Sequence, residues 1–81
     1  MSLLNVEYNE GVFRLELLMD EESRYFDVLV KHSGNIEYMK HDEELNPILF
    51  LNVHNMMKLN RIIKDFKNEK PVVFPIYIGE F

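Results

Sequence analysis

Apolar and polar residues are spaced with a different period in each half of this chain. Residues 3 to about 41 alternate between apolar and polar side chains, which is the period of half-buried β-strands. Residues 53 to about 68 repeat their apolar side chains at the spacing of one amphipathic helix. Together these two periodicities predict a single small α+β domain over residues 1–81. We expect an antiparallel four-stranded β-meander, one amphipathic helix packed on one face of it, and a C-terminal β-strand returning to the sheet.

Three turn signals divide the alternating half into four strands. The turns lie at residues 9–11, 20–23 and 33–35, which are rich in Gly, Asn and Asp, residues that tolerate positive φ. The strands are then expected over residues 4–8, 13–19, 25–31 and 36–41. The side chains expected to face the helix are Leu4, Val6, Tyr8, Phe13, Leu15, Leu17, Met19, Phe26, Val28 and Val30.

The register of the strands follows from requiring inward side chains to face one another, because a slip by one residue inverts every side chain. The expected inward pairs are Val6 with Leu15, Leu17 with Phe26, and Val30 with Tyr38. Two outward pairs in this register, Glu7 with Arg14 and Lys31 with Glu37, join opposite charges, which supports it.

The same register predicts a row of three ionisable side chains on the outer face of the sheet. Glu16 would lie opposite Asp27, and Asp27 opposite His41. Two carboxylates beside one imidazole are a set that can bind a divalent metal, or that can raise the pKa of one carboxyl group. The alternative interpretation is an ordinary polar face, on which Arg14 and His41 relieve the repulsion between the two carboxylates.

The helix has two candidate starting points. Asn46 before Pro47 is a favourable N-cap and first position, and Asn52 before Val53 is another. A helix from Pro47 would place Asn52 in the middle of the apolar face, so we predict Asn52 as the N-cap and a helix from Val53 to about residue 68. The apolar face is then expected to hold Val53, Met56, Leu59, Ile62, Ile63 and Phe66, with Met57 on the surface.

The last apolar segment, residues 72–78, is predicted to form a strand that is apolar on both faces. Such strands are usually buried on both faces, whereas Pro75 prefers an edge or a bulge because it lacks an N–H donor. Both preferences are met at a sheet edge that is covered either by another subunit or by the segment Ile48 to Leu51, which we expect to be extended. Parallel and antiparallel pairing of this strand both remain open, because the helix is long enough for a crossover.

Composition narrows the function classes without selecting one. The chain has no cysteine, which excludes disulfides, Cys-based zinc sites and thiol catalysis. It carries a net charge of −5, and neither a basic start nor an apolar leader segment is visible, so we expect a cytoplasmic protein without a membrane span. There is no phosphate-binding glycine loop, nucleophile elbow or H-E-x-x-H motif.

Two clusters of charge are candidates for binding sites. The acidic turns at residues 20–22 and 42–44 are expected at the same end of the sheet, but they lack the pattern of a calcium loop. Basic residues recur every three positions along the helix, and this spacing fans them around its circumference instead of forming one nucleic-acid-binding face. Those residues are Lys58, Arg61, Lys64, Lys67 and Lys70.

Apolar side chains on the outer face give the leading hypothesis for function. One helix covers only one face of a sheet, and exposed apolar patches on small domains usually mark contact sites. We therefore expect a non-catalytic protein–protein interaction or self-associating module, as a homodimer or with another protein, and no cofactor. The alternatives are a small metal-dependent or acid–base enzyme using Glu16, Asp27 and His41, and an accessory nucleic-acid-binding protein using the helix. The outer apolar residues are Val12, Leu18, Tyr25, Leu29 and Met39.

Overall fold

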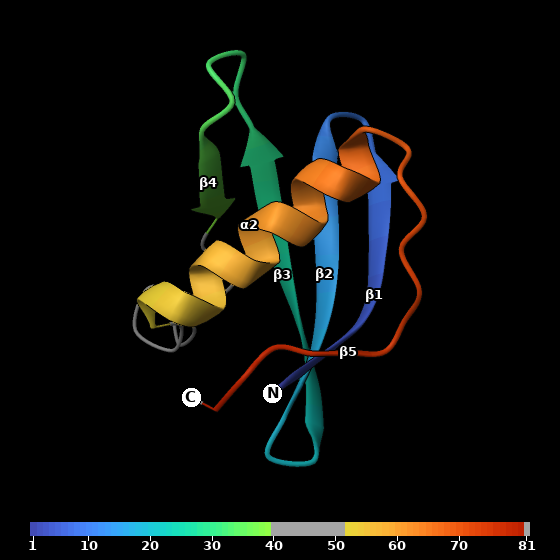
Figure 1. The fold of residues 1–81 in the computed structure, drawn as a ribbon, viewed down its shortest axis with the longest axis vertical. Coiled ribbons are helices and arrows are strands. Elements are labelled where there is room, and N and C mark those ends of the chain that lie inside the picture. The colour runs from blue at the N-terminus through green and yellow to red at the C-terminus, as the bar shows by residue number, and fades with distance from the viewer. Residues whose placement is uncertain (40–51, 81) are drawn as a thin grey trace.

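A five-stranded antiparallel sheet with one helix across it forms the part of the chain that the computed structural model describes, residues 1–39 and 52–80 (Figure 1). The strand order is β4-β3-β2-β1-β5. The predicted α+β class and the C-terminal strand are confirmed. In chain order the elements are β1 (Ser2–Asn9), β2 (Val12–Met19), β3 (Glu22–Val30), β4 (Ile36–Met39), α2 (Val53–Lys67) and β5 (Ile76–Tyr77).

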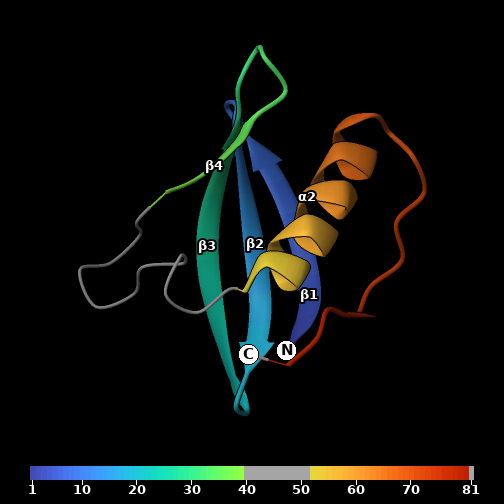
Figure 2. The ribbon, with the colours of Figure 1, turned by 60° about the vertical axis from the view of Figure 1, so that its left-hand side comes forward.

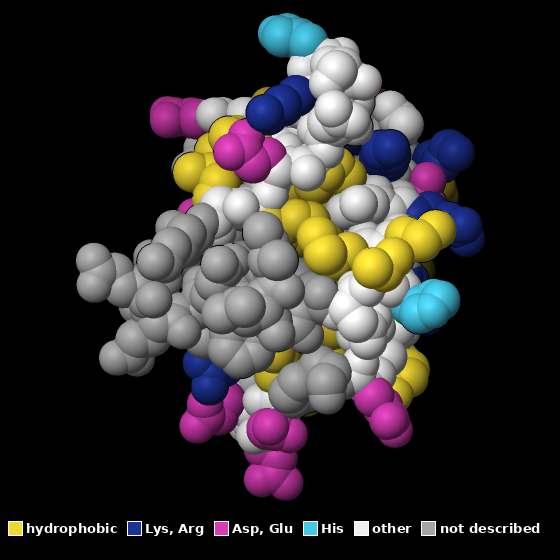
Figure 3. All heavy atoms as spheres, turned by 90° about the vertical axis from the view of Figure 1, so that its left-hand side faces the viewer, with side chains coloured by type: hydrophobic (Ala, Val, Ile, Leu, Met, Phe, Trp, Pro, Cys, Tyr) yellow, Lys and Arg dark blue, Asp and Glu magenta, His cyan; other side chains and the backbone are white. Residues whose placement is uncertain are grey.

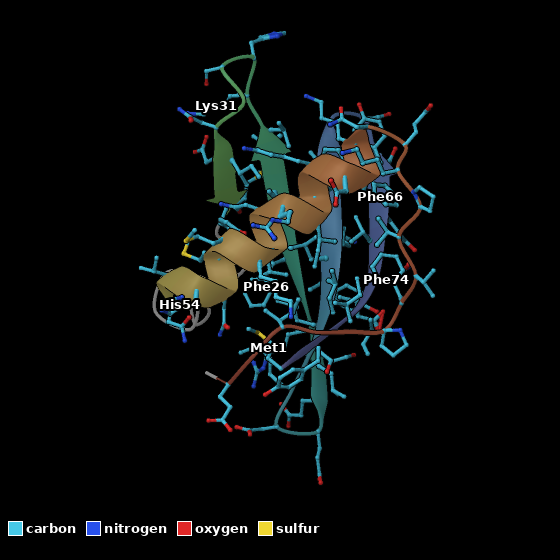
Figure 4. All side chains as sticks on the ribbon, viewed as in Figure 1. Met1, Phe26, Lys31, His54, Phe66 and Phe74 are labelled. Carbon is cyan, nitrogen blue, oxygen red and sulfur yellow. The ribbon has the colours of Figure 1, made fainter. Side chains whose placement is uncertain are left out.

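The core lies between the sheet and the helix. Helix α2 runs diagonally over one face of the sheet, and the turned view in Figure 2 shows it standing clear of the other face. Phe26 lies under the helix in Figure 4 and is fully buried. The buried apolar side chains are Leu3, Val6, Phe13, Leu15, Leu17, Met19, Phe26, Val28, Leu59, Ile62, Ile63 and Ile78.

The first two hairpins are closed by two-residue turns. Glu10 and Gly11 have φ values of 51° and 84°, and Asp20 and Glu21 have 48° and 65°. Positive φ at both central residues matches the right-handed twist of the flanking strands. The first turn confirms the predicted register of β1 and β2, in which Val6 lies opposite Leu15.

The second turn is two residues shorter than predicted, and the expected pairing of β2 with β3 is therefore wrong by two residues. Leu15, not Leu17, lies opposite Phe26, and Arg14, not Glu16, lies opposite Asp27. Because the shift is an even number, every side chain stays on the predicted face. The cause is local: Glu22 and Ser23 continue the ladder of β3 instead of lengthening the turn.

The third hairpin also differs from the prediction by two residues. Val28, not Val30, lies opposite Tyr38, and the loop closes with the Lys31 N–H donating to the Asn35 carbonyl at 2.8 Å. The predicted ion pair still forms, because Lys31 reaches Glu37 diagonally, with 3.2 Å between Nζ and Oε2.

A β-bulge in β1 changes which of two leucines enters the core. The register shifts between Leu3 and Asn5, so Leu4 is the extra residue. Leu3 is fully buried and pairs with Leu17, whereas Leu4 is half-buried. The prediction that Leu4 faces inward is wrong for this reason.

The helix begins at the second of its two candidate starting points, as predicted. The Asn52 side chain accepts a hydrogen bond from the Asn55 backbone N–H at 2.8 Å, and the helix starts at Val53. Leu59, Ile62 and Ile63 are buried as expected, and Met57 is exposed. Val53 is 70% exposed, against the prediction, because the first turn projects beyond the core.

The end of the helix is a Schellman motif with an unusual residue in it. The Lys70 N–H donates to the Asp65 carbonyl at 2.9 Å, and the Glu69 N–H donates to the Phe66 carbonyl at 3.1 Å. Glu69 has a φ of 59°, a conformation that glycine usually supplies. The motif turns the chain back towards the sheet and places residues 67–72 near the β1–β2 turn (Figure 1).

The C-terminal segment pairs with the sheet only briefly. β5 is antiparallel to β1, with Ser2 opposite Tyr77 and Leu3 opposite Ile76, which decides the open question of its direction. Its expected extent and two-sided burial are wrong: the strand has two residues, and Tyr77 is 60% exposed. Ile78 alone in this segment enters the buried core.

A buried asparagine fastens this segment to the helix. Asn55 is 3% exposed, and its side-chain amide donates to the Glu80 carbonyl at 2.7 Å. The Asn52 amide donates to the same carbonyl at 3.3 Å. Gly79 packs so closely that a Cβ at this position would collide with Asn55 Oδ1. Asn55 was not among the predicted core residues, because it is polar.

Candidate functional site

The predicted ionisable row does not assemble through the pairing that suggested it. Glu16 lies opposite Tyr25, and Asp27 lies opposite Arg14 and Met39. His41 lies outside the described residues, so the metal site of Glu16, Asp27 and His41 stays a prediction. Within residues 1–39 and 52–80, no group of three His, Cys, Asp or Glu side chains is arranged to hold a metal ion.

An ion pair stands at the centre of the outer face instead. Arg14 donates to Asp27 from Nε to Oδ1 at 3.0 Å and from a terminal nitrogen to Oδ2 at 3.4 Å. The hydrogen bonds and the negative charge of Asp27 raise the pKa of Arg14, and the charge of Glu7 adds to this. Arg14 therefore stays cationic and holds Asp27 in place, which is an arrangement suited to structure or recognition.

Acidic side chains gather at one end of the molecule. Asp20, Glu21 and Glu22 are exposed at the β2–β3 turn, and magenta side chains gather at the lower end in Figure 3. The second predicted acidic turn, residues 42–44, lies outside the described residues. Exposed carboxylates in a tight turn are typical of a charged surface that is solvated by water.

The basic residues of the helix are dispersed, as their spacing predicted. Lys58 donates to the Tyr77 carbonyl at 2.7 Å, and Lys70 lies 3.7 Å from the Asp65 carboxylate. Lys64 faces a different part of the surface from Lys67. A continuous cationic stripe along the helix is thus not formed.

A groove at the opposite end of the molecule from the β2–β3 turn was not predicted. It lies where the β1–β2 turn, the β3–β4 hairpin and the end of α2 come together, and its volume is about 770 Å³. We call it the hairpin groove. Its lining residues are Tyr8, Gly11, Phe13, Val30, Lys31, His32, Phe66, Lys67, Glu69, Lys70 and Val72.

Three aromatic rings run side by side along the hairpin groove. The ring centroids of Tyr8 and Phe13 are 4.8 Å apart, and those of Phe13 and Phe66 are 6.1 Å apart in an edge-on arrangement. Tyr8 is on the inner face of the sheet and yet 60% exposed. Its exposure comes from the position of the groove at the end of β1, and an aromatic residue beside a glycine turn was the only sequence signal for it.

Tyr38 makes a polar contact between sheet and helix. Its hydroxyl donates to Asn60 Oδ1 at 2.6 Å. Burial raises the pKa of Tyr38 above the ordinary tyrosine value, because the ionised phenolate would be poorly solvated there. The folded protein therefore holds the neutral form more strongly than the unfolded chain does.

The pH dependence of stability tests this burial. The stabilisation from neutral Tyr38 is fully present below the ordinary tyrosine pKa of about 10 and is lost as the pH rises above it. We expect urea unfolding between about pH 8 and pH 11 to show a decline in the free energy of unfolding that is smaller in Tyr38→Phe. Tyr77→Phe, at a 60% exposed position, should keep the full decline. Parallel declines in wild type and Tyr38→Phe would contradict the assignment.

Comparison with known proteins finds no relative of this chain. The chain matches no protein-family model, no curated protein and no solved structure. Among the described helices, none is long and apolar enough to cross a membrane.

Proposed function

We propose that this protein is a non-catalytic interaction module that pairs with a second copy of itself through the outer face of its sheet. The observation that carries the proposal is the contrast between the two faces. Helix α2 covers the inner face (Figure 2), whereas Leu18, Tyr25 and Met39 on the outer face are 37%, 48% and 37% exposed. Apolar side chains gathered on one face of a small domain are typical of a contact site.

The arrangement of charge on this face favours a second copy as the partner. The Arg14–Asp27 ion pair lies between the apolar pair Val12–Leu29 and the pair Glu16–Tyr25, beyond which Leu18 lies opposite Ser23. The Arg14 side chain is 50% exposed, so it can still donate to a carboxylate on a facing surface. A face that carries both signs near its centre is complementary to itself under a twofold rotation.

The dimensions of the sheet favour a weak dimer over a permanent one. Strands β1–β3, of eight or nine residues, together with the four-residue β4 give a face of at most roughly 27 Å by 19 Å, on the order of 500 Å² per subunit. Specific interfaces of standard size bury about 800 Å² per partner, and smaller ones are usually transient. We place this association in the cytoplasm, in keeping with a chain that has no cysteine.

Solution mass as a function of concentration tests the proposal. Light scattering or sedimentation should show the mass rising above the 9.8 kDa of the monomer between roughly 10 µM and 1 mM, the range of a weak interface. Tyr25→Glu should return the mass to that of the monomer, because it places a buried charge in the interface.

Val73→Glu is the matched control, at an 81% exposed position in the C-terminal segment. It should leave the association unchanged. Dissociation by Val73→Glu alone would move the interface to the C-terminal edge of the sheet. A monomer at every concentration would overturn the proposal.

A further inference from the structure

We propose that the hairpin groove binds a small amphipathic anion, a molecule with an apolar body and one carboxylate or comparable anionic group. The groove is separate from the outer face, so this inference does not depend on the dimer. A volume of about 770 Å³ falls within the range of small-molecule pockets, roughly 300–1,000 Å³.

The floor of the groove supplies contacts for an apolar body. The Tyr8 and Phe66 rings both pack against the buried Phe13 ring, and Val30 and Val72 also line the groove. Phe66 projects from the end of the helix towards the upper part of the sheet in Figure 4. These side chains come from β1, β2, β3, α2 and the segment after α2, so the groove is a product of the folded state.

The rim of the groove supplies positive charge. Lys67 and Lys70 line it together with His32, and Glu69 is its one acidic residue among the described lining residues. Lys31 also lines the groove, but its Nζ pairs with Glu37 at 3.2 Å, and in Figure 4 its side chain projects away from Phe66. Two lysines against one glutamate oppose the net charge of −5 of the whole chain. This local reversal of sign makes the groove complementary to an anion.

The existing ion pair of Lys70 leaves this side chain able to bind. Lys70 lies 3.7 Å from the Asp65 carboxylate, and its side chain is 65% exposed. An exposed pair of this kind contributes little to stability. An incoming carboxylate that is partly removed from water by the aromatic floor is a stronger acceptor than the solvated Asp65 carboxylate.

The exposure of the rings favours a small molecule over a single-stranded nucleic acid. Nucleic-acid platforms present several open rings on which successive bases stack. Here Phe13 is 3% exposed, so its face is covered, and Tyr8 is the ring that is open to solvent. An aliphatic or aromatic body lying along the edges of the rings fits this floor better.

The test uses octanoate, 1-octanol and octylamine, which share an alkyl chain and differ in charge. We expect amide chemical shifts in NMR spectra to report octanoate binding at Gly11 and Lys67. Octanol should bind roughly tenfold more weakly, the loss of one charge-assisted contact, and octylamine more weakly still. The chain has no tryptophan whose fluorescence could report binding. Displacement of the fluorescent anion anilinonaphthalene sulfonate therefore provides an independent measure of the affinity of each probe.

Two pairs of variants separate the charge from the apolar floor. Lys67→Gln should weaken octanoate roughly tenfold without affecting octanol. Its control is Lys64→Gln, one turn earlier and outside the groove, which should affect neither. Tyr8→Ser should weaken octanoate and octanol alike, whereas Tyr77→Ser, at an equally exposed position, should not.

Several results would overturn the proposal. Equal affinity for the three probes would contradict the preference for an anion. Chemical-shift changes centred on the outer face would contradict binding in the hairpin groove. Tighter binding of a single-stranded oligonucleotide at Gly11 and Lys67 would replace the small anion with a nucleic acid. Tyr8, Lys64 and Lys67 lie away from the outer face, so the solution mass of their variants reports separately on the dimer. Tyr77 lies opposite Ser2, on the same face as Leu18, so the mass of Tyr77→Ser is measured as well.

Discussion

Replacing Leu59 with alanine is expected to lower the free energy of unfolding by about 2–5 kcal/mol. Leu59 is fully buried on the face of α2 that packs against the sheet. Truncation removes apolar contacts and leaves a cavity between two rigid layers, neither of which can collapse into it. Urea unfolding followed by far-ultraviolet circular dichroism measures the loss, since helix and sheet report together.

Met57→Ala is the control for Leu59→Ala. Met57 is on the same helix and 63% exposed, so its truncation should change the free energy of unfolding by no more than about 0.5 kcal/mol. Equal losses in the two variants would mean that the helix presents a different face to the sheet.

The contact between Asn55 and Gly79 gives the second large effect. Asn55→Ala removes a buried hydrogen bond to the Glu80 carbonyl and should cost about 1–3 kcal/mol. Gly79→Ala introduces a Cβ that collides with Asn55 Oδ1 and should cost about 1–3 kcal/mol through overpacking. Both single losses are measured by urea unfolding.

The double variant tests whether the two effects share one contact. When Asn55 is already alanine, the added methyl at residue 79 has room, so the double variant should lose less than the sum of the single losses. Gly34→Ala is a useful comparison, because its backbone φ of 88° disfavours alanine while its surroundings are open. Strictly additive losses for Asn55→Ala and Gly79→Ala would contradict the collision.

Periodicity predicted the elements and their faces because both follow from local physics. Alternation placed Phe13, Leu15 and Leu17 on the inner face, and the position of Asn52 relative to the apolar arc identified the start of the helix. The register of the second hairpin could not be predicted in this way. A shift by two residues preserves every face, so only the conformation of Asp20 and Glu21 distinguishes the two pairings.

The candidate site was harder to predict than the fold. The hairpin groove joins Tyr8, Lys31 and Phe66, which are far apart in the sequence and have no shared motif. Burial of Asn55 depends on a carbonyl that lies 25 residues away in the chain. Bulges such as the one at Leu4 move a residue from one face to the other without a clear mark in the pattern.

The pairing of β1 with β5 has a much larger entropic cost of loop closure than the hairpin contacts have. Hairpins β1–β2 and β2–β3 close loops of two residues, whereas β5 returns to β1 only after more than seventy residues, with two ladder pairs and a bond from the Ile78 N–H to the Met1 carbonyl at 2.9 Å. Closure of a long loop has a larger entropic cost, which is offset here by bonds from Met1, Asn52, Asn55 and Lys58 to this segment and by burial of Ile78. We therefore expect the meander to form before this contact does. Release of the C-terminal segment would expose the edge of β1 to strand exchange between molecules, so these few side chains also protect the sheet from association through its edge.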